Sequence, residues 1–241
     1  MSLVALGWVE CGYISADQPN LWTALCRPAP GMTWSAVETA SILGMWTAMT
    51  LAMMLPAASP MILTYAEIAD TAARVGERVV SPLILIAGYL AVWFVFALAF
   101  TAAQMTVSGL ILPLGKTVSA ALSSATLAGI VIIAAGAYQF SSIKHACLYR
   151  CQRPFPFFFA NWTDRTSGVF KLGLRQGLYC LGCCWALMLV MFALGAMNIV
   201  WMAVLGVVMT IEKMTTTGRF ARALGVCLMV VGALLTVIGS V

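Results

Sequence analysis

The sequence predicts an all-α protein, a polytopic membrane helical bundle of about six transmembrane helices with a short interfacial helix. Of its 241 residues, 62% are hydrophobic and only 9% are charged, whereas a soluble domain has roughly 45–50% and 25%. Apolar runs long enough to cross a bilayer recur along the chain and are bounded by proline, glycine or charged residues. Most basic residues also fall in alternate loops. These observations leave no room for a large soluble domain.

Six segments have the apolar character of a span, which needs about 20 residues. They are residues 34–56, 82–112, 119–143, 172–196, 198–211 and 221–241. The second is long enough to be tilted or kinked, and the fifth is short. Between the first two, residues 60–80 combine apolar positions at helical spacing with acidic and basic side chains, which predicts an interfacial amphipathic helix. Its acidic residues favour a solvated linker over strong attraction to anionic lipid.

Residues 1–33 are expected to form an outward-facing tail. Residues 34–241 are expected to form a single transmembrane helical domain. The first residues lack a basic region and carry Glu10 and Asp17, so they do not have the pattern of a secretory signal. Cys11 and Cys26 lie in this tail. On the outer side of a membrane they could form a disulfide, or they could remain free thiols.

The distribution of lysine and arginine predicts the orientation. Apart from Arg27 and Lys116, all of the 13 basic residues fall after the first, third and fifth segments. By the positive-inside rule these loops face the cytoplasm and both termini face the periplasm. The formal net charge of +5 is explained by this bias, so no nucleic-acid partner is expected. The lipid bilayer is the expected partner.

Five cysteines flank one predicted cytoplasmic loop. Cys147 and Cys151 are four residues apart, and Cys180, Cys183 and Cys184 share a helical face in the next segment. Two antiparallel helices would bring these faces together. In a reducing compartment, clustered thiols favour a metal or redox role, and thiolates select soft or borderline ions such as Cu(I) and Zn(II). The alternative is packing, because cysteine is readily buried and membrane helices pack through small residues.

Several neighbouring residues extend this hypothesis. His145 could complete a coordination shell or lie at the wet interface. Met49 and Met53 belong to a stripe with Met45 in the first segment, where thioethers would suit Cu(I) or simply fill apolar gaps. Four basic residues near the loop are expected to offset the thiolate charge. They are Lys144, Arg150, Arg153 and Arg175.

Three stretches carry a family resemblance. "MWTAMTLAMMLPAASPMILTYAE", "GAYQFSSIKHACLYRCQRP" and "GLRQGLYCLGCCWALMLVMFALGAMNIVWMAVLGVVMTIEK" resemble the bacterial family described as predicted metal-binding integral membrane proteins of unknown function. The resemblance covers about residues 45–213 and implies a helical bundle in the bacterial inner membrane, with all five cysteines kept. Gln176 and Gln152 stand where that family has histidine and arginine, and glutamine cannot replace imidazole toward a soft ion.

These observations favour a non-catalytic protein that binds Cu(I), Zn(II) or a similar ion and handles copper or delivers it to a membrane enzyme. The chain has no complete catalytic set, although enzymatic activity is left open. The alternative is a structural or assembly subunit of a larger membrane oxidoreductase or photosynthetic complex, with the cysteines as packing residues. A thiol–disulfide enzyme that uses the adjacent Cys183 and Cys184 is a third possibility, but no haem or quinone site is evident.

Overall fold

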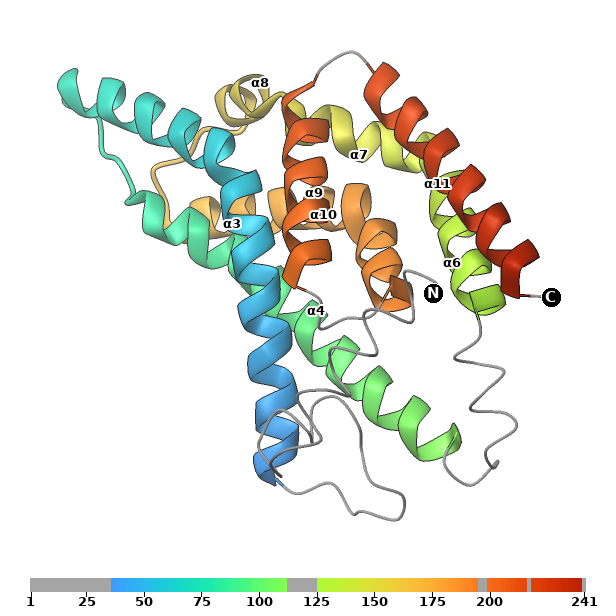
Figure 1. Cartoon of the computed structure of the whole chain (residues 1–241). Coiled ribbons are helices and arrows are strands. Elements are labelled where there is room, and N and C mark those ends of the chain that lie inside the picture. Colours follow the sequence, from blue (N-terminus) through green and yellow to red (C-terminus); the bar gives the residue numbers. More distant parts are fainter. Residues whose placement is uncertain (1–35, 112–124, 195–198, 216–217, 240–241) are drawn as a thin grey trace.

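The computed structural model describes residues 36–111, 125–194, 199–215 and 218–239, and within these residues all regular structure is α-helical (Figure 1). The all-α class is therefore confirmed. The helices are α3 (Ala36–Arg74), α4 (Pro82–Ile111), α6 (Ala125–Tyr138), α7 (Ser142–Gln152), α8 (Pro154–Ala160), α9 (Thr166–Leu194), α10 (Ile199–Met214) and α11 (Arg219–Gly239). The expected tail and its two cysteines lie outside the described residues.

The number of helices able to cross a membrane is smaller than six in the described part of the chain. Helices α3, α4, α9 and α11 are long and apolar enough. A fifth crossing results if α6 and α7, which are bent by 65° relative to each other, form one broken span. Helix α10 has 16 residues, about 24 Å of helix against a hydrocarbon core of about 30 Å. The predicted count of six is therefore not confirmed.

Helix α3 corrects the expectation of a span that ends at Pro56 and a separate interfacial helix. The helix continues through Pro56 and Pro60 to Arg74 and changes direction along its length (Figure 1). Because Pro60 has no N–H, the Pro56 carbonyl loses its usual helical partner. The Ser59 hydroxyl donates a hydrogen bond of 2.8 Å to that carbonyl oxygen. A local side chain thus satisfies the carbonyl, and the helix bends without ending.

Helices α4 and α9 pack closely against each other. A Cβ atom added to Gly88 of α4 would collide with the Phe170 carbonyl oxygen of α9, and one added to Gly173 would collide with the Leu85 carbonyl oxygen. Small residues permit such close approach of helix backbones. Helix α3 packs against α4, while α6 and α11 run side by side (Figure 1). Buried residues of α4 and α9 that follow Gly88 and Gly173 in the sequence pack with buried residues of α3 in one hydrophobic core.

Candidate metal site

Three thiols form a compact group on α9. The Sγ atoms of Cys180, Cys183 and Cys184 lie within 4.8 Å of one another, and their side chains are buried, with 2% exposure or less. The i, i+3, i+4 spacing places them on one helical face. Sulfur atoms that share one ion at about 2.3 Å each are separated by about 3.8–4.6 Å. The group therefore has the spacing of a metal site before any ion binds.

Met54 of α3 completes this sulfur group. Its Sδ atom lies 4.0 Å from the Cys180 Sγ and 3.9 Å from the Cys184 Sγ. The sequence pattern pointed to Met49 and Met53, which are buried elsewhere on α3; Met53 faces α10 near Gly206. Met54 was missed because it lies about 100° around the helix from Met53. Its only sequence signal is the Met53–Met54 doublet.

Cys180 has the most polar surroundings of the three thiols. The Lys213 Nζ donates a hydrogen bond of 2.9 Å to its Sγ, and the Tyr89 hydroxyl lies 3.0 Å from the same sulfur. Tyr89 also donates to the Met54 carbonyl oxygen at 3.3 Å. An ammonium directed at a sulfur atom favours its thiolate form. Lys213 was expected only to set orientation, so its place beside the thiol is new.

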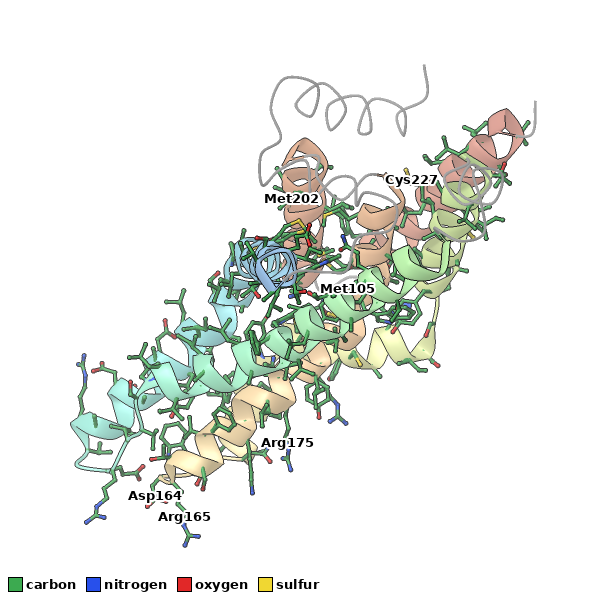
Figure 2. The ribbon with its side chains drawn as sticks, turned by 90° about the horizontal axis from the view of Figure 1, so that it is seen from below. Met105, Asp164, Arg165, Arg175, Met202 and Cys227 are labelled. Carbon is green, nitrogen blue, oxygen red and sulfur yellow. The ribbon has the colours of Figure 1, made fainter. Side chains whose placement is uncertain are left out.

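Three of the four basic residues expected to offset the thiolates have other partners. Lys144 forms a buried salt bridge of 2.7 Å with Glu212. Burial raises the pKa of the Glu212 carboxyl, and the Lys144 ammonium opposes this shift. Arg150 donates to the Tyr179 hydroxyl at 2.6 Å, and Arg153 lies over the Tyr149 ring. Arg175 is exposed and points away from the bundle (Figure 2).

Helix α7 brings two further thiols to the edge of the group. Cys147 and Cys151 lie on this helix, where their four-residue spacing places them on one face, and both are half-buried. Both lie near Cys183, but neither belongs to the group of three. Gly182 of α9 allows α7 to approach closely, because a Cβ atom added to this glycine would lie only 2.7 Å from the Cys147 Sγ.

His145 and Cys227 lie outside the sulfur group. His145 is half-buried on α7 and, two residues before Cys147, projects about 200° around the helix from it. It is not part of the close ligand group found in the described residues. Cys227 is exposed on α11 and does not belong to the close ligand group. Cys227 is therefore a matched control for substitutions within the group.

A small cavity adjoins Cys180. Its volume is about 20 Å³, and its lining includes Cys151, Gln176, Cys180 and Lys213, which is space for about one water molecule or a bare ion. The Gln176 Oε1 is buried and has no hydrogen-bond partner among the described residues. Gln176 therefore offers an unused carbonyl oxygen beside the thiols.

Gln152, the other departure from the resembled family, has a structural partner. Its Nε2 donates to the carbonyl oxygens of Glu212 and Thr215, at 2.9 and 2.8 Å. These carbonyls belong to the end of α10, where helical hydrogen bonds run out. Gln152 therefore holds this end of α10, including Lys213, against α7.

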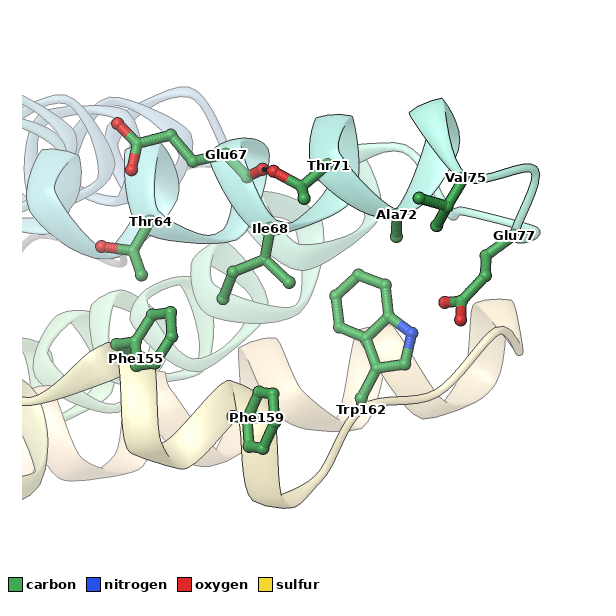
Figure 3. A pocket seen from close by; sticks show the side chains of 10 residues that line it. All are labelled: Thr64, Glu67, Ile68, Thr71, Ala72, Val75, Glu77, Phe155, Phe159 and Trp162. Carbon is green, nitrogen blue, oxygen red and sulfur yellow. Dashed lines mark hydrogen bonds between the residues drawn. The ribbon is translucent and has the colours of Figure 1, made fainter.

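A larger groove of about 610 Å³ lies between the second half of α3 and the region of α8 (Figure 3). Phe155, Phe159 and Trp162 form one wall, and α3 forms the other (Figure 3). The residues lining it include no thiol or histidine. It therefore lacks the soft ligands of the sulfur group.

A family model decides the relationship of the chain to known proteins. The model of PpoB2, described as a copper chaperone, matches residues 43–235. The protein belongs to this copper chaperone family. The matched region contains the whole sulfur group, including Met54, and it also contains Lys213. No curated protein and no solved structure matches the chain.

The family and the thiol group together support copper handling and fit Cu(I) as the bound ion. They give no specific support for Zn(II). The metal-binding character expected from the sequence agrees with the PpoB2 family. The resemblance to the predicted metal-binding integral membrane proteins is not itself confirmed by this match.

Proposed function

We propose that the protein is a membrane-embedded copper chaperone that carries Cu(I) between Cys180, Cys184 and Met54. The observation that supports this most directly is the position of the Met54 thioether, 3.9 to 4.0 Å from both thiols. Two thiolates and a thioether form a soft ligand set suited to Cu(I). Cys183 supplies a third thiol within the same group.

Copper is cargo in this proposal, so the ion must also leave. Cys147 and Cys151 are half-buried, whereas the three thiols of α9 are buried. We assign them the role of exchange ligands between the buried group and the surface. A thiolate of α7 binds Cu(I) as a thiolate of α9 releases it, so the ion passes on without any change in oxidation state. Met49, Met53 and His145 have no part in this exchange.

The cellular setting is also part of the proposal. Helices α3, α4, α9 and α11 have the length and hydropathy for crossing a bilayer, and we place the protein in the bacterial inner membrane with both termini in the periplasm. The C-terminal ends of α3 and α10 lie at the same end of the molecule as α8 (Figure 1). Basic residues follow both helices, in keeping with a cytoplasmic side. Cu(I) taken up there would be delivered to a membrane enzyme.

The first experiment is elemental analysis of protein purified in mild detergent without added chelator. The wild type is compared with Cys180→Ser/Cys184→Ser and with the control Cys227→Ser. We expect about one copper per chain in the wild type and the control, and copper lost from the double variant. Wild-type copper content in the double variant would contradict the proposed site. Absence of metal throughout, with other subunits co-purifying, would instead support a structural role in a larger membrane oxidoreductase or photosynthetic complex.

A further inference from the structure

The charges around the sulfur group do not cancel. Lys144 and Glu212 pair at 2.7 Å with side chains only 1% and 3% exposed, so together they contribute no net charge. Lys213 is the neighbouring residue of α10 and donates instead to the Cys180 Sγ at 2.9 Å. Among the described residues, no other Lys or Arg is within hydrogen-bond distance of these thiols. One positive charge is thus fixed at the site.

We propose that Lys213 is a specificity-determining residue that selects a monovalent ion over a divalent one. The inference rests on the proposed function. In the ligand set of the proposed function, where Cys180 and Cys184 are thiolates and Cys183 remains a thiol, the Lys213 ammonium leaves one unit of negative charge, which Cu(I) neutralises. A divalent ion such as Zn(II) would leave one unit of positive charge in surroundings where the thiols are nearly inaccessible to water. An uncompensated buried charge is costly, so the divalent ion is disfavoured.

The position of Lys213 is fixed by its surroundings. Gln152 holds the carbonyl oxygens of Glu212 and Thr215, on either side of Lys213. The Lys144–Glu212 salt bridge ties the same turn of α10 to α7. Because these contacts tie the turn to α7, the backbone of Lys213 is held in place, and the ammonium is positioned at the Cys180 Sγ by its own hydrogen bond.

The test compares Cu(I) and Zn(II) affinities of the full chain in detergent under reducing, anaerobic conditions. Each affinity is measured by competition with a chromophoric chelator of the same ion. Lys213→Gln removes the charge and keeps a hydrogen-bond donor, while Lys213→Arg keeps the charge. Lys171→Met is the control, because Lys171 is exposed on α9. Lys213→Met is a second neutral variant in case Lys213→Gln does not purify as a folded helical protein.

We expect the ratio of Cu(I) to Zn(II) affinity to fall at least about tenfold in the neutral variants, equivalent to about 1.4 kcal/mol. The ratio should be unchanged in Lys213→Arg and Lys171→Met. A neutral variant that binds Cu(I) with the wild-type ratio overturns the role of Lys213 and leaves the proposed function intact. If the wild type binds no Cu(I), the proposed function fails, and the selectivity inference fails with it.

Discussion

The Met54 Sδ lies 3.9 Å from the Cys184 Sγ, although 130 residues separate the two in the sequence. The contact joins α3 to α9 through sulfur atoms inside the core. Both side chains are buried, at 0% and 1% exposure. A bound soft ion would therefore have ligands from two helices, and its binding would depend on how those helices pack.

Replacing Met54 with leucine tests this relationship. The change removes the thioether and nearly conserves volume, so stability should fall by less than about 1.5 kcal/mol. We expect Cu(I) affinity to drop at least about tenfold, because one soft ligand is lost. Competition with a Cu(I) chelator measures the affinity. Met49→Leu is the control, since Met49 is buried outside the sulfur group; an equal loss in both variants would mean that Met54 acts through packing.

The buried pair of Lys144 and Glu212 should be more important for stability than any exposed pair. Glu212→Gln leaves the Lys144 ammonium buried without its charge partner, at a cost of about 3–5 kcal/mol. Asp70→Asn removes the exposed pair with Arg74, whose side chains are 64% and 78% exposed, and should cost about 1 kcal/mol or less. Unfolding of the purified proteins in detergent measures both. Similar values for the two variants would contradict a structural role for the buried pair.

Gly182 sets the distance between α7 and α9. A methyl group at this position would lie 2.7 Å from the Cys147 Sγ and would strain the 2.6 Å hydrogen bond from the Tyr138 hydroxyl to the Gly182 carbonyl oxygen. We expect Gly182→Ala to cost about 1–3 kcal/mol of unfolding free energy by overpacking.

A second substitution should rescue this variant. Cys147→Ala removes the sulfur, and the Cys147 Cβ that remains is 3.4 Å from the added methyl group. Gly182→Ala/Cys147→Ala should therefore recover most of the lost stability in the same unfolding measurement. Gly44→Ala is the control, since nothing lies within 4 Å of its added Cβ. Failure of the double variant to recover would show that the strain is not at Cys147.

Local spacing made part of the site predictable. The shared faces of Cys180 with Cys184 and of Cys147 with Cys151 follow from the helical period, once α7 is found to be helical. Long apolar runs likewise predicted the all-α class. The course of α3 was not predictable by the same means, because a proline is usually a stop signal and the compensating Ser59 hydroxyl is a single local contact.

Partners from distant segments could not be found from periodicity. Met54 and Lys213 reach Cys180 through the packing of α3 and α10 against α9, and nothing in their own segments distinguishes them from other methionines and lysines. The positive-inside pattern explained Lys213 without placing it in the core. Conversely, Arg175 was expected near the thiols from sequence proximity, but it faces outward from α9.

The thiols of α7 should control how fast copper leaves and not how much copper is held. Cys147→Ser/Cys151→Ser keeps the sulfur group of Cys180, Cys184 and Met54 intact, so about one copper per chain should still be bound. Release of Cu(I) to an excess of a soluble chelator should slow at least about tenfold, because the buried thiolates then lack an exchange partner nearer the surface. Stopped-flow absorbance of the chelator complex measures the rate, with Cys227→Ser as the control. Loss of copper at equilibrium would make Cys147 and Cys151 resident ligands, whereas an unchanged rate would mean that copper leaves by a route that avoids α7.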